Sequence, residues 1–344
     1  YQEAQEIIEN RNNTISNEVS LTGKEYFVED EVVEAILIMD EIAKQSRKKR
    51  ELNGAINFNK KEVFFKLDND KNPVKVLLKE SKDANKLIEE FMLIANKKVA
   101  ELFSEVKKQK YIYRVHDLPD NEKLRSLKHI VKSFGYTLDL TSSKGISKSL
   151  NKLLNDVKDK EEQNLIESLI LRSMSKAEYS TNNIGHYGLS FVNYTHFTSP
   201  IRRYPDILVH RLLQDIMDKK YGKRDKSLQK KATHCSDQEN IAVKAERESI
   251  KFMQIKFMKN KIGETFNGII SGVSDWGIYV ELEENKCEGM VYVKDIKDDK
   301  YFYSRDEASL IGKNTKKKYQ LGDSIIVKVK KADLNKKHLD FLII

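Results

Sequence analysis

The 344-residue sequence contains only two cysteines, Cys235 and Cys287, and they do not form a Cys-x-x-Cys pair. Two such residues cannot build the disulfide framework of a small secreted domain, so we expect free thiols in a reducing compartment. No long uncharged apolar run is present, and the first residues show neither the basic start nor the apolar stretch of a signal peptide. We therefore expect a cytoplasmic protein that does not span a membrane.

Charged side chains make up 33% of the sequence and hydrophobic ones 39%, a mixture that can bury a core. Lysine and arginine number 62 against 53 aspartates and glutamates, which gives a formal net charge of +9. This excess favours an acidic partner, nucleic acid above all, but does not separate RNA from DNA or from an anionic membrane. A well-solvated lysine-rich surface explains the charge about equally well. Because the first residue is Tyr1 and not methionine, we expect the chain to begin inside a longer protein.

Apolar residues at helical spacing predict a helix over residues 31–48 and a longer one over 83–107. The same pattern predicts helices near 120–134, 144–157, 161–175 and 207–217, and alternation predicts short strands at 55–56, 63–65 and 74–77. Asp68-Asn69-Asp70 predicts a turn between the last two strands. Ser236 and Glu239 have the spacing of a capping box, so we expect a helix to begin there and to end near Lys261.

From Glu264 onward the pattern changes to short strands that are separated by turns. The predicted strands are residues 266–273, 278–282, 289–293, 324–329 and 338–343. Five short strands in a segment of this size predict a small closed barrel, for which the OB-fold is the natural candidate. Alternation places Ile278, Val280 and Leu282 inside this barrel and Tyr279 outside.

We place a domain boundary near Ile262, which divides the chain into residues 1–261 and 262–344. The first part is expected to have an α+β fold, with long helices and a mixed sheet. The second part is expected to be the all-β OB-fold barrel, and we expect it to fold independently.

Polar and aromatic side chains are concentrated in residues 185–211, more densely than in an ordinary surface loop. Ser199-Pro200 has the composition of a helix start, with serine as the cap and proline at the first position. Pro205 argues instead for a later start or for a kink.

In either case Arg202 and Arg203 lie near a helix N-terminus. Free N–H groups and the helix dipole favour an anion there, and a guanidinium group adds a fork that fits a phosphate. A buried arginine that pairs with Asp206 or with a glutamate explains these residues about equally well.

The residues from His196 to Asp206, followed by His210-Arg211, resemble the signature of the ribonuclease II family, and its ribonuclease R branch in particular. The likeness extends over residues 54–56, 87–92 with 95–96, 114–116, 171–174, 234–236 and 245–247, and together with the terminal barrel it covers nearly the whole chain. It implies an exoribonuclease that hydrolyses single-stranded RNA processively from the 3′ end and releases nucleoside 5′-monophosphates. In the family, RNA threads a narrow channel to a buried site where Mg²⁺ activates water.

The family's metal-binding aspartates precede the region that Tyr1 resembles, and we find no equivalent in this sequence. Asp68 and Asp70 belong to a predicted turn, and Asp298-Asp299 belong to the barrel. We therefore expect no metal ligands here and place the Mg²⁺ ligands upstream. The alternative is a non-catalytic fragment that binds single-stranded RNA; in either case we expect a monomer.

The resemblance assigns roles to individual residues. Arg202 matches an arginine that lies against the RNA phosphate beside the metal, which implies stabilisation of the transition state. Glu246 matches a carboxylate near the RNA 3′ end and is expected to orient Arg202 or the terminal nucleotide. Glu90, or its neighbour Glu89, matches a glutamate that contacts a base, although mid-helix glutamates are usually just solvated. The neighbours of Arg202 that we expect to bind RNA are His196, Thr198, Ser199, Arg203 and Tyr204. 

Histidines offer no metal site in this pattern. His116, His186 and His196 lack metal-ligand spacing. Such histidines are more often packed and hydrogen-bonded parts of a structure than ligands.

The barrel resembles the OB-fold RNA-binding domain that is repeated in a small-subunit ribosomal protein, on the strength of residues 268–280 and 289–293. Trp276, Tyr279 and Tyr292 would form a platform on which bases stack, at about 1–3 kcal/mol per base. The lysines expected to attract phosphate are Lys294, Lys316, Lys317, Lys318, Lys328 and Lys330. The alternative for Trp276 is that it merely packs a hairpin turn.

Overall fold

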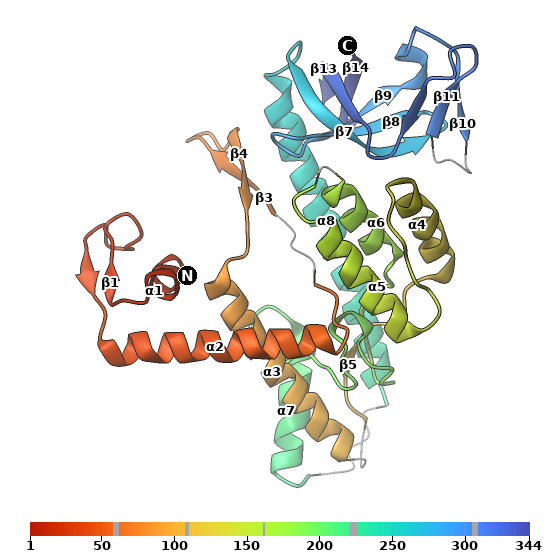
Figure 1. Ribbon diagram of the computed structural model, residues 1–344. Coiled ribbons are helices and arrows are strands. Elements are labelled where there is room, and N and C mark those ends of the chain that lie inside the picture. The colour runs from red at the N-terminus through yellow and green to blue at the C-terminus, as the bar shows by residue number, and fades with distance from the viewer. Residues whose placement is uncertain (58–61, 107–109, 161, 221–225, 305–308) are drawn as a thin grey trace. The chain divides into compact units, whose positions relative to one another are not determined.

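The computed structural model describes the whole chain except residues 58–61, 107–109, 161, 221–225 and 305–308 (Figure 1). The chain forms two compact units. The first contains Tyr1–Asn59, Ser81–Asp156 and Leu169–Asn240, and the second contains Lys60–Glu80, Val157–Ser168 and Ile241–Ile344. Among the described residues, no helix is both long enough and apolar enough to cross a membrane.

Helices dominate the first unit. They are α1 (Gln2–Asn10), α2 (Asp30–Leu52), α3 (Asp83–Glu105), α4 (Asn121–Ser133), α5 (Ser143–Asp156) and α7 (Tyr204–Met217), while α6 (Gln163–Ser173) and α8 (Leu228–Lys259) have residues in both units. Over the described residues, each predicted helix is thus present, although α8 begins earlier than predicted. Helix α2 has Asp30 and Glu31 in its first turn and Lys49 and Arg50 in its last turn, an order that matches the helix dipole.

Clusters of buried apolar side chains organise this unit. Ile8 on α1 packs with Ala43 on α2 and Leu87 on α3. A second core, which includes Phe103 and Val209, joins α3 to α7 and to strands β5 (Tyr113–Val115) and β6 (Glu178–Ser180). The polar segment 185–206 therefore lies between elements that this second core fixes.

The strands before the barrel pair two by two and antiparallel. These pairs are β1 (Thr14–Ile15) with β2 (Tyr26–Phe27), β3 (Glu62–Leu67) with β4 (Pro73–Lys79), and β5 with β6, and a parallel bridge joins His116 to His186. Asp68 accepts the N–H groups of Asp70 and Asn72, which confirms the predicted turn. The strand predicted at residues 55–56 is wrong, because this buried piece is irregular and its Ile56 N–H donates to Gly188 O.

Helix α8 corrects the predicted capping box. The helix begins at Leu228, so Ser236 and Glu239 lie well inside it. Leu228 and Ala232 are buried in the core, and this burial extends the helix toward its N-terminus beyond the predicted start. The Ser236 hydroxyl donates to Ala232 O, one turn back, rather than to a free helix end.

The second unit contains the predicted barrel. Strands β7 (Thr265–Ser274), β8 (Gly277–Leu282), β9 (Glu288–Tyr292), β13 (Ser324–Asp333) and β14 (His338–Ile343) close in the order β13-β14-β9-β8-β7. Ile278, Val280 and Leu282 are fully buried and Tyr279 is 40% exposed, so the predicted alternation is confirmed. A three-stranded sheet, β10 (Tyr301–Ser304), β11 (Ser309–Gly312) and β12 (Lys318–Gln320), was not predicted.

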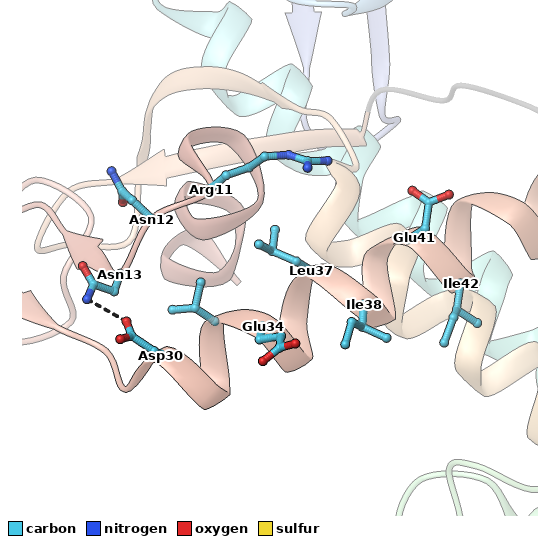
Figure 2. Close-up of a pocket in the computed structure, with 10 residues that line it drawn as sticks. Arg11, Asn12, Asn13, Asp30, Glu34, Leu37, Ile38, Glu41 and Ile42 are labelled. Atoms are coloured by element: carbon cyan, nitrogen blue, oxygen red, sulfur yellow. Dashed lines mark hydrogen bonds between the residues drawn. The ribbon is translucent and has the colours of Figure 1, made fainter.

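An open hollow of about 780 Å³ lies along α2 (Figure 2). Ile38 and Ile42 are exposed on it, and Asn13 donates a hydrogen bond of 3.0 Å to Asp30 at one end. None of the residues to which the sequence assigns a role lines this hollow.

Candidate functional site

The segment that carries the two arginines ends at the start of α7. Helix α7 begins at Tyr204, with Arg203 as its cap residue and Pro205 in its first turn. Proline suits this place because the first N–H groups of a helix have no helical acceptor. The later start indicated by Pro205 is confirmed, and Ser199 O accepts the N–H groups of Arg202 and Arg203 in the preceding turn.

The two arginines have different surroundings. Arg203 Nη2 donates to Asp206 Oδ1 at 2.8 Å, and the Asp206 carboxylate is fully buried and also accepts the Ser199 N–H. Arg202 is exposed, and its guanidinium has no hydrogen bond or ion pair to any residue that the structure describes. The alternative of an ion-paired arginine thus applies to Arg203, while Arg202 is available to a ligand.

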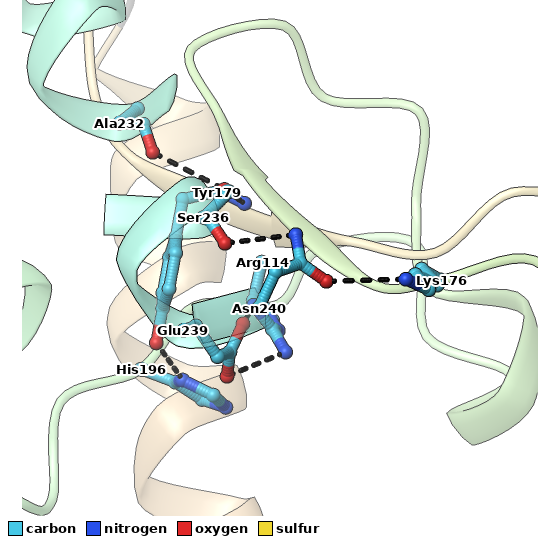
Figure 3. A network of polar contacts seen from close by, with 8 residues as sticks. All are labelled: Arg114, Lys176, Tyr179, His196, Ala232, Ser236, Glu239 and Asn240. Atoms are coloured by element: carbon cyan, nitrogen blue, oxygen red, sulfur yellow. Dashed lines mark hydrogen bonds and ion pairs between the residues drawn. The ribbon is translucent and has the colours of Figure 1, made fainter. Parts of the chain in front are cut away.

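His196 lies in a network that links its own irregular segment to β5, β6 and α8 (Figure 3). Its Nδ1 is 2.8 Å from the Tyr179 hydroxyl, and the Arg114 guanidinium lies 4.6 Å from the centre of the Tyr179 ring. Glu239 accepts both terminal nitrogens of Arg114, at 2.5 and 3.0 Å. Burial, together with the positive charges of Arg203 and Arg114, lowers the pKa of His196 to about 2, so the ring is neutral.

The other residues near Arg202 are partly accessible. Tyr204 is exposed, and Thr198 and Ser199 are half-buried. Thr198 Oγ1 is buried and has no hydrogen-bond partner in the described part of the chain. Asn96 is buried on α3, accepts the Phe197 N–H and donates to the Tyr194 hydroxyl. These two hydrogen bonds attach the segment that precedes Arg202 to α3.

His116 and His186 are packed, as the sequence indicated. His116 donates from Nε2 to Ser175 O at 2.7 Å and accepts the Gly188 N–H on Nδ1 at 2.9 Å. The ring of His186 lies 5.0 Å from that of His116, and burial lowers the pKa of His186 to about 3. Both are neutral parts of the structure.

Glu90 is not a solvated mid-helix glutamate. Its side chain is buried on α3, bonds to Arg50 and lies 3.9 Å from Arg47, whereas Glu89 is exposed. The sequence did not reveal these two arginines as partners, because they lie on another helix and no local pattern links them to Glu90. The predicted base contact of Glu90 stays a prediction.

Glu246 is exposed on the part of α8 that belongs to the second unit, and Arg202 belongs to the first. Its predicted role in orienting Arg202 also stays a prediction.

The barrel exposes two of the aromatic side chains to which the sequence assigns RNA binding, Trp276 and Tyr279. Trp276 is 76% exposed, so its indole does not pack into the hairpin core. Tyr279 and Tyr292 line a hollow of about 380 Å³, together with Arg247 and Lys251 of α8. 

Some of the predicted phosphate-binding lysines already have partners. Lys294 Nζ lies 5.1 Å from the centre of the Tyr292 ring. Lys330 pairs with Asp295 at 2.7 Å and Lys317 with Asp298 at 3.2 Å, while Lys316 and Lys328 are exposed.

The described residues do not fit a magnesium site. They contain no group of three histidine, cysteine, aspartate or glutamate side chains that could hold a metal ion. Asp68 is occupied by the turn it closes, and Asp299 accepts the N–H groups of Lys300, Asn314 and Thr315, which hold the pKa of Asp299 below its usual range. We therefore derive no chemical step through a metal bound by these residues.

Comparison with known proteins supports the resemblance noted in the sequence. The RNB domain matches residues 1–219, and the S1 RNA binding domain matches residues 259–344. The chain belongs to the RNB-domain family. Ribonuclease R of Aquifex aeolicus (strain VF5) is 38% identical over 316 residues, which cover 91% of this chain and 44% of that protein. Ribonuclease R of Thermotoga maritima is 37% identical over 93% of this chain and 46% of that protein.

A solved RNB-family structure has the same fold. It is described as Mycoplasma genitalium RNase R in complex with ribose methylated single-stranded RNA. Its TM-score is 0.86 at 30% identity, over 94% of this chain and 52% of that one. The chain thus spans about half the length of the relatives it matches.

Proposed function

We propose that this chain is the RNA-gripping part of a ribonuclease R-type enzyme, which shortens single-stranded RNA processively from its 3′ end and releases nucleoside 5′-monophosphates. The observation that carries the proposal is the contrast between exposed Arg202 and ion-paired Arg203 at the start of α7, within the RNB match. The Mycoplasma genitalium relative, described with bound single-stranded RNA, supports RNA as the ligand.

Arg202 would bind the scissile phosphate. Its guanidinium is free, and the first N–H groups of α7 add the positive end of the helix dipole beside it. Fixed positive charge at this place stabilises the charge that develops on the phosphate oxygens during hydrolysis. Glu246 would orient Arg202 or the terminal nucleotide, and Glu90 would act at a base, directly or through Arg50 and Arg47.

The barrel would also bind single-stranded RNA. Trp276 and Tyr279 expose aromatic surface on which bases stack, and Tyr292 with Lys294 lies at the next strand. Stacking tolerates any base, and electrostatic attraction follows the backbone, so this surface suits an enzyme that moves along single-stranded RNA.

Hydrolysis would need Mg²⁺, which residues outside the described ones would hold. If no such residues are present in the natural protein, the chain is a non-catalytic RNA-binding protein, an alternative favoured by the lack of a metal-ligand cluster among the described residues. We further propose that the protein acts as a monomer in the cytoplasm.

The deciding experiment incubates the chain with 5′-labelled single-stranded RNA and Mg²⁺, and follows the RNA on a sequencing gel with filter binding in parallel. Binding without shortening would support the RNA-gripping part alone. Stepwise shortening from the 3′ end that Arg202→Ala abolishes, and Arg125→Ala does not, would show a complete nuclease; Arg125 is an exposed arginine on α4. Absence of RNA binding would contradict both functions.

A further inference from the structure

Two contacts hold Tyr179, one at its backbone and one at its ring. Its backbone N–H donates to Ser236 Oγ at 2.8 Å. The Arg114 guanidinium covers one face of its ring, and Glu239 fixes Arg114 through two hydrogen bonds (Figure 3). The phenol hydroxyl is thereby directed at His196 Nδ1, at 2.8 Å.

The chemistry of the two groups sets the direction of this hydrogen bond. A phenol is a stronger acid than a neutral imidazole N–H, and an imidazole nitrogen is a stronger base than a phenol oxygen. The Tyr179 hydroxyl therefore donates and Nδ1 accepts. A neutral imidazole has a single N–H, so its proton lies on Nε2.

The second ring nitrogen of His196, Nε2, is available to a ligand. Its ring is half-buried, with Tyr179 and Tyr194 edge-on to it, and Nε2 has no hydrogen-bond partner in the part of the chain that the structure describes. The nearby charges are those of Arg114, Arg202 and Arg203, with neutral His186 also close. Arg114 pairs with Glu239 and Arg203 with Asp206, whereas Arg202 has no ion pair among the described residues. A donor that carries no charge of its own thus accompanies the unpaired charge of Arg202.

We propose that Tyr179 is a positioning residue that holds His196 in its Nε2–H form, and that this N–H donates a hydrogen bond to an oxygen of the RNA backbone. The proposal rests on the proposed function, because it names the contact that the RNA would make beside Arg202. It distinguishes two kinds of backbone contact: a charged one by Arg202, and a neutral one by His196 that releases no counterions.

The first test needs no RNA. In the chain labelled with ¹⁵N-histidine, long-range ¹H–¹⁵N spectra distinguish a protonated Nε2 from a protonated Nδ1. We expect Nε2–H for His196 and a change in its signals in Tyr179→Phe. We expect no change in Tyr187→Phe, whose buried hydroxyl has no hydrogen-bond partner among the described residues. Protonated Nδ1 in the unmodified chain would overturn the proposal.

The second test measures RNA affinity by fluorescence anisotropy with a 3′-terminal single-stranded oligonucleotide over a range of salt concentrations. His196→Leu removes the donor and should weaken binding about tenfold, while His196→Gln, which keeps an N–H at the same place, should stay within about twofold. Tyr179→Phe should lie between them, and the salt dependence should be unchanged in all three.

The outcomes separate the two proposals. Equal losses in His196→Leu and His196→Gln would show that His196 acts through packing alone, and would overturn its role as a donor. If the unmodified chain binds no RNA, the proposed function fails and the RNA contact fails with it, while the ¹⁵N spectra still decide whether Tyr179 sets the protonated nitrogen.

Discussion

Arg203 and Asp206 form an ion pair of 2.8 Å across the first turn of α7, and the Asp206 carboxylate is completely shielded from solvent. The same carboxylate oxygen accepts the Ser199 N–H. Asp206 therefore closes the turn that carries Arg202. The position of the unpaired Arg202 depends on this turn, which Asp206 holds together with Arg203.

Asp206→Ala should lower the free energy of unfolding of the first unit. Removal of one partner leaves Arg203 half-buried and unpaired, a change that costs about 3–5 kcal/mol for buried pairs. Urea unfolding followed by circular dichroism measures it. Asp218→Ala at the other end of α7 is the control, because Asp218 is exposed and its pairing with Lys220 contributes at most about 1 kcal/mol. Equal effects of the two substitutions would contradict the structural role of Asp206.

Arg202→Ala should weaken RNA binding without loss of stability. One lost phosphate contact reduces the slope of log affinity against log salt by about 0.7 for single strands. The free energy of unfolding should change by no more than about 0.5 kcal/mol, because the side chain is exposed and unpaired among the described residues. Arg125→Ala removes an equal charge from α4 and should leave the slope unchanged. An identical slope for both variants would show that Arg202 makes no specific contact.

Local sequence patterns predict much of the barrel and of the turn that carries Arg202 and Arg203. The alternation at residues 278–282 fixes which face is buried, and Pro205 fixes the start of α7. The pairs Arg114–Glu239 and Arg50–Glu90 do not follow, since their members are 125 and 40 residues apart and no local pattern links them. The capping box at Ser236 failed for a related reason: tertiary burial of Leu228 and Ala232 outweighed a local signal.

RNA should quench the fluorescence of the barrel. Trp276 is the only tryptophan in the sequence and its indole is exposed, so its emission reports on this surface alone. Stacking of a base on the indole would quench the emission and contribute about 1–3 kcal/mol to binding. Titration of the unmodified chain with oligouridylate measures the quenching. Filter binding compares its RNA affinity with that of Trp276→Phe, a variant that keeps an aromatic ring but has no tryptophan emission. Unchanged emission at saturating RNA would exclude Trp276 from the platform.

Acidification should destabilise the first unit before its carboxylates are protonated. Burial lowers the pKa of His186 to about 3 and that of His196 to about 2, whereas histidines of the unfolded chain titrate near 6.5. Below pH 6.5 the unfolded state therefore binds more protons, so stability is complete above that pH and falls as pH decreases toward 3. Urea unfolding at pH 7.5, 6 and 5 measures the loss. His186→Asn, which keeps an acceptor for the Leu189 N–H, should lose less stability between pH 7.5 and 5 than the unmodified chain. His129→Ala, at an exposed position, should lose as much as the unmodified chain.

Gly277→Ala should disrupt the barrel. The φ angle of Gly277 is +154°, and a Cβ there would lie 2.0 Å from Val291 O, a backbone atom of the neighbouring strand. Pairing of β8 with β9 cannot persist at that distance, so the loss should exceed about 3 kcal/mol. Gly263→Ala is the control, because Gly263 also has a positive φ, of +93°, but its Cβ would meet nothing within 4 Å. Only backbone strain of about 1 kcal/mol is expected there.

Urea unfolding followed by Trp276 fluorescence reports the barrel alone, and equal midpoints for the two variants would contradict the close approach of β8 and β9. Because Gly277 directly follows Trp276, the loss of this approach should also remove the RNA-dependent quenching, whereas Gly263→Ala should retain it.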